Sequence, residues 1–222
     1  MIDLKRVSGA VFDLDGTLLD SMEMWQKIDR EYLKGFGRVP PEDLQRRIEG
    51  FSVTETAQFF QTAFDISDSI DRIIADWNRM ARAEYLERLP LKDGAAELVK
   101  KLAALGIRLG IATTNYRDLT EGCLARHGIL PLFSAVVTSG EIEKGKPDPE
   151  IYLKAAAAIG VKPENCLVFE DLPAGILAGK RAGMQTVAVY DRASAAVDNE
   201  KRKMADDYAV SPAEWLRNNL PD

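Results

Sequence analysis

Cysteine and histidine are scarce in this chain of 222 residues, which has two cysteines and a single histidine. The cysteines form no C-x-x-C pair, and neither the spacing of a zinc site nor that of a small disulfide-linked domain is present. We therefore expect Cys123 and Cys166 to be buried, reduced thiols. His127 follows a helical pattern, and we expect it to cap the end of that helix.

Positive charge is not in surplus, since 29 Lys and Arg residues stand against 35 Asp and Glu residues, for a net charge of −6. This balance argues against a general nucleic-acid-binding surface. It does not exclude an anionic substrate, because a metal ion and one lysine can reverse the sign of the charge inside a cleft.

Long apolar runs are also missing. No uninterrupted apolar stretch is long enough to span a bilayer, and we expect no membrane partner. Lys5 and Arg6 are followed by only a short apolar segment, which is unlike a signal peptide, so we expect a cytoplasmic location.

Short apolar runs alternate with amphipathic segments over most of the chain. This alternation predicts an α/β fold, with a Rossmann-like parallel sheet and helices on both of its faces. Such sheets carry their chemistry at the carboxyl ends of the strands. The predicted strands are 9–14, 108–113, 135–138, 166–169, 186–190 and 207–210; the helices between them are 95–105, 119–127, 149–159 and 174–182, and two more helices flank the last strand within 192–222. Glycines follow the four listed helices, where left-handed caps are expected, at Gly106, Gly128, Gly160 and Gly183.

Residues 21–89 interrupt this alternation with helical patterns alone. Trp25 and Tyr32 mark one face of a first helix, a second helix opens at 40–43, and Ser52 and Glu55 match a capping box. A longer amphipathic pattern covers 70–89. We predict a helical cap domain over residues 19–89 and a catalytic core over 1–18 and 90–222, with hinges at 18–21 and 88–92.

The segment VFDLDGTL, residues 11–18, places two carboxylates at the end of a buried strand. Because strand pleating sends alternate side chains the same way, we expect Asp13 and Asp15 to face one pocket. Two adjacent carboxylates repel each other, so a cation or a proton shared with a substrate must compensate. A strand that ends in an Asx turn is the structural alternative.

Thr113, Thr114 and Asn115 follow a second buried strand, directly before a helical pattern. Hydroxyl groups and free backbone N–H groups at a helix start form a cradle for an anion. Hydroxyl residues also cap helices without any ligand, so this motif is weak by itself.

Lys146 lies in the segment GKPDPE, residues 145–150, where glycine and proline pin the backbone on either side of it. One fixed ammonium group would offset the charge of a phosphoryl group. An ordinary charged loop is the alternative.

Glu170 and Asp171 end a further apolar strand, directly before a helix. Acidic residues at a helix start are routinely caps. However, a hard cation such as Mg²⁺ prefers a few carboxylate oxygens together with water and phosphate. Asp13, Asp15 and Asp171 together would supply such a site, and we predict Mg²⁺ as the cofactor.

The four motifs in this order resemble the haloacid dehalogenase superfamily, and specifically its phosphatase-like members with a helical cap inserted after the first strand, such as β-phosphoglucomutase and phosphoglycolate phosphatase. The resemblance covers nearly the whole chain. It implies that Asp13 is the nucleophile, which forms an aspartyl-phosphate, and that Asp15 is the general acid and base. It also implies that Thr113, with the backbone near Thr114, binds the phosphoryl oxygens and that Lys146 neutralises their charge.

The resemblance further implies how Mg²⁺ is held. Asp13, Asp171 and the backbone carbonyl of Asp15 would be ligands. Glu170 would lie beside the ion, either bound through water or orienting Lys146.

Two kinds of relative within this superfamily are disfavoured, one by Asp15 and the other by the absence of a cap lysine. In relatives that cleave haloalkanoates the acid/base carboxylate is missing, because a halide leaves without a proton, so Asp15 favours phosphoryl transfer. Phosphonoacetaldehyde hydrolases carry a cap lysine for a Schiff base, and residues 47–53 contain none.

A sugar phosphomutase resembling β-phosphoglucomutase is the main alternative. Mutases of that type place a histidine where this chain has Trp25, and a cap arginine for a second phosphate where it has Val53. We therefore favour transfer to water. Cap-side and rim contacts to the substrate are then expected from Trp25, Glu49, Phe51 and Asn115.

These observations predict a Mg²⁺-dependent phosphatase that hydrolyses a small phosphorylated metabolite through an aspartyl-phosphate. We expect a monomer that binds neither nucleic acid nor membrane. A non-catalytic protein of the same fold is a third interpretation, which the four intact motifs disfavour.

Overall fold

One parallel sheet forms the centre of the molecule. The computed structural model describes residues 2–220, so Met1 and residues 221–222 of the predicted core lie outside the described residues. Within this range the strand order is β3-β2-β1-β4-β5-β6, and every neighbouring pair is parallel. The strands are β1 (Gly9–Phe12), β2 (Arg108–Thr113), β3 (Phe133–Thr138), β4 (Cys166–Glu170), β5 (Gln185–Val189) and β6 (Asp207–Ala209).

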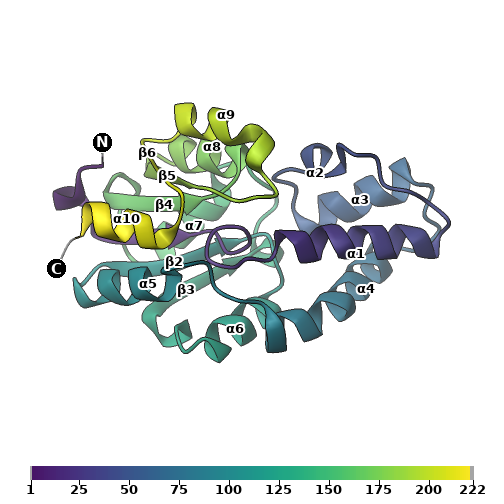
Figure 1. Cartoon of the computed structure of the whole chain (residues 1–222), viewed down its shortest axis with the longest axis horizontal. Coiled ribbons are helices and arrows are strands. Elements are labelled where there is room, and N and C mark those ends of the chain that lie inside the picture. Colours follow the sequence, from purple (N-terminus) through teal and green to yellow (C-terminus); the bar gives the residue numbers. More distant parts are fainter. Residues whose placement is uncertain (1, 221–222) are drawn as a thin grey trace.

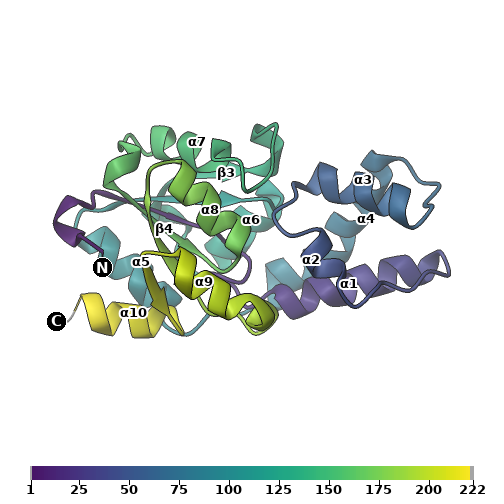
Figure 2. The same ribbon diagram turned by 90° about the horizontal axis from the view of Figure 1, so that it is seen from above.

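Helices cover both faces of this sheet (Figures 1 and 2), which confirms the predicted α/β class. Side chains of β1 alternate between the faces: Phe12 stacks on Phe169 with ring centroids 4.7 Å apart and shares an apolar cluster with Leu98, whereas Val11 packs in a second cluster with Ile151. The first cluster is covered by α5 (Ala95–Ala104), α6 (Arg117–Arg126) and α10 (Pro212–Asn219), and the second by α7 (Glu150–Ala158) and α8 (Pro173–Arg181), with α9 (Asp198–Met204) packed on α8.

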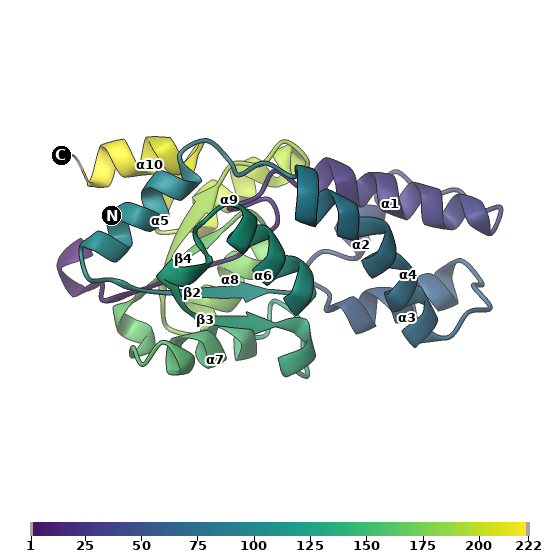
Figure 3. The same cartoon turned by 90° about the horizontal axis from the view of Figure 1, so that it is seen from below.

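A bundle of helices is inserted between β1 and β2 and lies beyond the carboxyl ends of the strands (Figures 1 and 3). Its own core is aromatic, since the ring of Trp77 meets those of Phe60 and Tyr32 edge to face, with centroids 4.9 and 5.7 Å away. This arrangement confirms the predicted helical cap. Its elements are α1 (Met22–Gly35), α2 (Leu44–Arg47), α3 (Val53–Ala63), α4 (Ile70–Ala83) and a π-helical turn (Glu84–Arg88).

Several element boundaries differ from the predicted ones. β1 ends at Phe12 and not at residue 14, because the carbonyl of Leu14 accepts from the backbone N–H groups of Leu18 and Leu19, 2.9 Å away in both cases, and closes a turn. β3 begins at Phe133, two residues before the predicted start. The second cap helix is a single turn, and the pattern over 70–89 divides into α4 and the π-helical turn.

Smaller local predictions are confirmed. The four glycines after the core helices have φ between +67° and +81°, and Ser52 and Glu55 form the capping box at the start of α3. Cys123 and Cys166 are free and buried, and His127 lies at the C-cap of α6. Among residues 2–220, no helix combines the length and the apolar character that crossing a membrane requires.

Candidate active site

The predicted motifs meet at the carboxyl edge of the sheet, at the point where the strand order changes direction between β1 and β4. Asp13 follows β1, and its backbone N–H donates to the carbonyl of Phe169 in β4, 3.0 Å away. Glu170 is the last residue of β4, Asp171 comes next, and Thr113 ends β2. Parallel sheets of this order bind ligands at this switch point.

Lys146 reaches this edge from the loop after β3 and joins two carboxylates. Its ammonium group lies 2.6 Å from Asp13 Oδ1 and 2.5 Å from Glu170 Oε1, and the Tyr152 hydroxyl donates to Glu170 Oε1 at 2.8 Å. Burial alone would lower the pKa of Lys146, but the charges of Asp13 and Glu170 raise that pKa above its ordinary value. The lysine therefore stays cationic beside Asp13.

Three buried carboxylates lie close enough to share a cation. Oxygen atoms of Asp13, Glu170 and Asp171 lie within 4.8 Å of one another. Burial raises the pKa of Asp171 well above its ordinary value, and the charges of Glu170 and Asp13 raise it further. A hard divalent cation would offset this repulsion, and carboxylate oxygens are the ligands it prefers.

The hydrogen bonds of these carboxylates separate their roles. Glu170 Oε2 accepts from the backbone N–H groups of Asp171 and Leu172 at 2.9 and 3.1 Å, and its Oε1 is bound by Lys146 and Tyr152. Asp171 Oδ1 accepts from the Thr17 hydroxyl at 3.2 Å, whereas its Oδ2 is buried without a hydrogen-bond partner among the described residues. Such a buried acceptor fits a metal ligand, so this geometry favours Asp171 for the cation and Glu170 for holding the lysine.

Glycine leaves room for both carboxylates. A Cβ on Gly16 would lie 2.2 Å from Asp171 Oδ2, and one on Gly175 would lie 1.8 Å from Glu170 Oε1. Gly16 also has φ +84°, a conformation that disfavours other residues. The turn after β1 and the start of α8 therefore require glycine for steric reasons.

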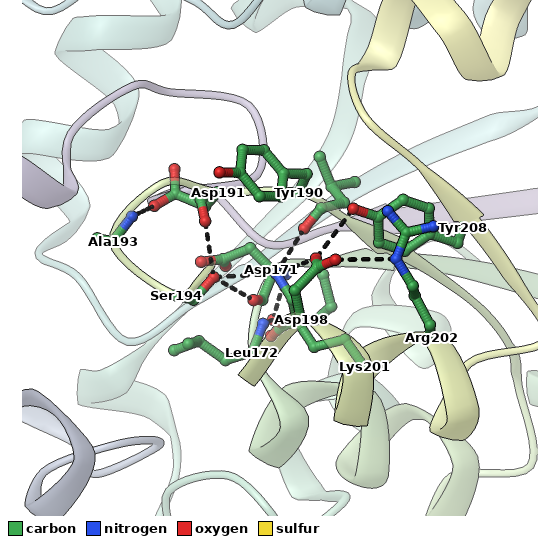
Figure 4. A network of polar contacts seen from close by, with 12 residues as sticks. Asp171, Leu172, Tyr190, Asp191, Ala193, Ser194, Asp198, Lys201, Arg202 and Tyr208 are labelled. Atoms are coloured by element: carbon green, nitrogen blue, oxygen red, sulfur yellow. Dashed lines mark hydrogen bonds and ion pairs between the residues drawn. The ribbon is translucent and has the colours of Figure 1, made fainter. Parts of the chain in front are cut away.

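A buried lysine, Lys201, is linked to Asp171 through the hydroxyl of Ser194 (Figure 4). The Ser194 hydroxyl lies 3.1 Å from the carbonyl of Asp171, to which it can donate, and accepts from Lys201 Nζ at 2.9 Å. Lys201 also donates to the carbonyl of Val189 at 3.2 Å. Burial lowers the pKa of Lys201, and the nearby carboxylates, Asp171 first, oppose that change. Sequence reasoning missed Ser194, which precedes α9, and Lys201 on α9, because the short helical pattern does not show which of its lysines is buried.

Asp15 is held where the chain crosses between core and cap. Its Oδ1 accepts from the Ser21 hydroxyl at 2.5 Å and from the Tyr85 hydroxyl, and its Oδ2 accepts from Asn115 Nδ2 at 2.8 Å. Trp25 Nε1 donates to the Tyr85 hydroxyl at 2.8 Å. Asn115, predicted as a rim contact, thus binds Asp15. Tyr85 was missed because its position in a helical pattern indicated only burial.

Thr113 and Thr114 lie next to this network at the start of the α6 segment. The buried Thr113 Oγ1 accepts from the backbone N–H of Asn115 at 3.1 Å, and both threonines line the central cavity. The side chain of Asn115 accepts from the N–H of Tyr116 at 2.7 Å and orders the turn before α6.

A cavity of about 480 Å³ separates the core carboxylates from the cap. Trp25, Glu49 and Phe51, the predicted cap-side contacts, line it. Glu49 also accepts from the backbone N–H of Ala174 in α8 at 3.1 Å, which ties the cap to the core. Further cap residues on this wall that sequence reasoning did not single out are Gln26, Asp29, Gln45 and Arg46.

Cap and core backbones touch beside Lys146. A Cβ on Gly50 would lie 2.4 Å from the carbonyl oxygen of Lys146, and one on Gly145 would lie 2.6 Å from both the Gly50 carbonyl and the Ser52 nitrogen. Two glycines thus allow the cap loop and the lysine loop to meet without side chains between them. We call this contact the glycine seam.

Known proteins resemble this chain in sequence and in fold. A model of the haloacid dehalogenase-like hydrolase family matches residues 10–189. The chain belongs to this family. Over 184 residues it is 35% identical to the validoxylamine A 7'-phosphate phosphatase of Streptomyces hygroscopicus subsp. limoneus, a match that covers 81% of this chain and 84% of the relative. It is also 32% identical over 188 residues to hexitol phosphatase A of Escherichia coli K12, with 83% of each chain covered.

Solved structures share this architecture. The crystal structure of a β-phosphoglucomutase from Clostridium difficile superposes with a TM-score of 0.79 over 96% of each chain, at 22% identity, and at that identity the likeness concerns the fold alone. Together with the sequence relatives, the family match confirms the predicted family and the prediction of a phosphoric monoester hydrolase.

Proposed function

We propose that this hydrolase is a Mg²⁺-dependent phosphatase that cleaves a small phosphorylated metabolite through an aspartyl-phosphate on Asp13. The observation that carries the proposal is the position of the Asp13 carboxylate. It is buried at the switch point, bound by Lys146 on one oxygen and close to the Asp171 carboxylate, whose Oδ2 has no hydrogen-bond partner among residues 2–220. A buried carboxylate beside a fixed ammonium group and a cation site is suited to attack a phosphoryl group.

Each step has a residue of this chain to perform it. A carboxylate oxygen of Asp13 forms a bond to phosphorus while the bond to the leaving alcohol oxygen breaks, and Asp15 gives its proton to that oxygen. Water then attacks the aspartyl-phosphate, Asp15 takes up the water's proton, and inorganic phosphate leaves with Asp13 restored. Lys146 and the hydroxyl of Thr113 stabilise the charge on the phosphoryl oxygens.

The donor set fits a bound Mg²⁺. Asp13 and Asp171 would hold the ion, with the backbone carbonyl of Asp15 as a further ligand by family resemblance. When bound, the ion would supply positive charge that neutralises the phosphoryl oxygens. Glu170 would act on Lys146, as its hydrogen bonds indicate.

Transfer to water is favoured over transfer to a second phosphorylated substrate. Trp25 and Val53 line the cavity at the positions where mutases of this fold place a histidine and an arginine. The named activities of the two sequence relatives, on validoxylamine A 7'-phosphate and as a hexitol phosphatase, also favour hydrolysis. We therefore propose hydrolysis as the reaction, with a sugar phosphomutase as the alternative.

The test is turnover of 4-nitrophenyl phosphate with and without Mg²⁺. Metal-dependent release of phosphate supports the proposal, as does protein that carries the labelled phosphoryl group of the substrate after acid quenching. No turnover at any Mg²⁺ concentration overturns it. Incubation with β-glucose 1-phosphate and a hexose bisphosphate primer separates the alternative, because a mutase forms glucose 6-phosphate without releasing phosphate.

Three further predictions accompany this function. We propose a core of residues 1–18 and 90–222 and a cap of residues 19–89 that moves on its two hinges. A monomeric state and a cytoplasmic location also remain predictions, which size-exclusion chromatography with light scattering and cell fractionation test.

A further inference from the structure

We propose that Asp29 and Gln45 form a hydroxyl-binding subsite in the cap, and that the leaving alcohol is an uncharged polyol or sugar. This inference rests on the proposed function, since it names the substrate class of the same cavity. It is carried by the contacts of one buried carboxylate and by the charge of the cavity wall around it.

Asp29 lies on α1 with 7% of its surface exposed, and it lines the cavity. Its Oδ2 accepts from Gln45 Nε2 at 2.7 Å. Its Oδ1 has no hydrogen-bond partner within residues 2–220, and neither does the side-chain carbonyl of Gln45, which lines the same cavity. The pair therefore offers a ligand two acceptor oxygens, which match the donors of neighbouring hydroxyl groups.

Asp29 forms no ion pair within residues 2–220, unlike Asp43 and Asp76 of the cap. Asp43 pairs with Arg47 at 2.9 Å, and Asp76 lies 3.1 Å from Arg72 and 2.6 Å from Arg79. Burial raises the pKa of Asp29 to about 6, and the Gln45 hydrogen bond and the charge of the neighbouring Arg30 oppose only part of that effect. A carboxylate kept in a costly position beside a cavity, with one oxygen free, is typical of a ligand-binding group.

The charge of the cap wall disfavours a second anionic group on the substrate. Four acidic residues of the cap line the cavity, against the single basic residue Arg46 among the described cap residues that line it. The acidic ones are Asp29, Glu42 and Glu49, together with Asp43, whose charge Arg47 offsets. A second phosphate or a carboxylate would be repelled there, whereas hydroxyl groups find acceptors.

Aromatic side chains complete the subsite. Trp25 and Phe51 line the same cavity and offer apolar faces. A polyol or sugar has C–H groups that pack on such faces while its hydroxyls reach the polar groups. A cavity of about 480 Å³ has room for a leaving group of this size as well as the phosphoryl group.

The experiment compares two substrates that share the phosphoryl group and differ in hydroxyls: sorbitol 6-phosphate and 4-nitrophenyl phosphate. For Asp29→Ala and for Gln45→Leu we expect kcat/KM for sorbitol 6-phosphate to fall about 10- to 100-fold, as lost hydrogen bonds to a charged and a neutral acceptor imply. We expect kcat/KM for the aryl phosphate to change less than about threefold, because that alcohol makes no hydroxyl contacts. Asp76→Ala, which removes a cap carboxylate outside the cavity, is the matched control and affects both substrates equally.

Equal losses on both substrates in Asp29→Ala and Gln45→Leu would overturn the subsite, since they would indicate a tie between α1 and α2 only. A wild-type preference for phosphoglycolate or a sugar bisphosphate over sorbitol 6-phosphate would overturn the substrate class. If Asp29→Ala does not fold, the comparison of the two substrates rests on Gln45→Leu alone. If the wild type turns over no phosphate ester, the proposed function fails. The subsite is then still tested by calorimetric binding of sorbitol 6-phosphate to the wild type and to Gln45→Leu. Equal affinity of the two proteins contradicts the subsite.

Discussion

The two walls of the cavity hold their charged groups in different ways. On the core wall, Lys146 and Glu170 have every charged atom bound within the protein, and glycines leave the carboxylates only enough space to fit. On the cap wall, within residues 2–220, Asp29 Oδ1 has no hydrogen-bond partner and Arg46 forms no ion pair. The core wall is therefore pre-organised for one reaction, while the cap wall keeps its polar atoms for the part of the substrate that varies.

Two sets of contacts join the catalytic core wall to the substrate-selecting cap wall. Glu49 and the glycine seam fix the cap loop against α8 and the Lys146 loop. Tyr85 brings a hydroxyl from the end of the cap to Asp15. The following predictions test whether the core wall carries out catalysis while the cap wall selects the substrate.

Asp13→Asn should have the largest effect. It removes the attacking carboxylate oxygen and the ion pair with Lys146, so we expect kcat to fall by about 10⁴-fold or more for every substrate. Phosphate release from 4-nitrophenyl phosphate and sorbitol 6-phosphate measures it. Retention of more than a few per cent of the wild-type rate would refute the role of Asp13 as nucleophile.

Asp171→Ala should weaken the metal site. Because Asp171 Oδ2 is a buried oxygen without a hydrogen-bond partner in the described part of the chain, we expect the Mg²⁺ concentration for half-maximal rate to rise at least ~10-fold. Rates across a Mg²⁺ titration measure this, and Glu49→Gln on the cap wall is the control that leaves the titration unchanged. A titration that coincides with the wild type argues against Asp171 as a ligand.

Tyr85→Phe should lower kcat about 10-fold, because it removes one hydrogen bond to the Asp15 carboxylate and leaves the Mg²⁺ titration unaltered. Tyr116→Phe is a matched control, since that hydroxyl joins core to cap by donating to the carbonyl of Ile74 at 3.2 Å and does not contact Asp15. Equal kinetics for the two variants would mean that the Tyr85 hydroxyl contributes nothing to the position of the acid/base group.

Asp29→Asn should have the smallest effect and an opposite sign, because it should stabilise the fold. Burial raises the pKa of Asp29 to about 6 from 3.8, so the folded protein loses stability as pH rises from about 4 through 6, and the loss persists at higher pH. Asparagine removes this cost, and we expect the free energy of unfolding at pH 7 to rise by about 1–3 kcal/mol. Urea unfolding at pH 4 and pH 7 measures it, and a gain that does not grow between these pH values contradicts the prediction.

Sequence and structure agree best where a motif is local. The carboxylates at 13, 15, 170 and 171 could be placed at one sheet edge because parallel strands bring their carboxyl ends together. The contacts of Tyr85 and Lys201 could not be predicted, because each partner lies far away in the chain and helical periodicity indicates burial without a direction. The pairing of Asp29 with Gln45 depends on how α1 meets α2, which no spacing in the sequence specifies.

The glycine seam has a consequence for altering the substrate range of this enzyme. Residues 49 and 51 present side chains to the cavity, while the backbone between them rests on the loop of Lys146. Libraries that randomise Phe51 therefore sample new alcohols at constant catalytic geometry, provided that Gly50 and Gly145 are left untouched and Glu49 keeps its hydrogen bond from Ala174. Even alanine at either glycine would displace the loop of Lys146, and the rate would then fall for every substrate by a similar factor.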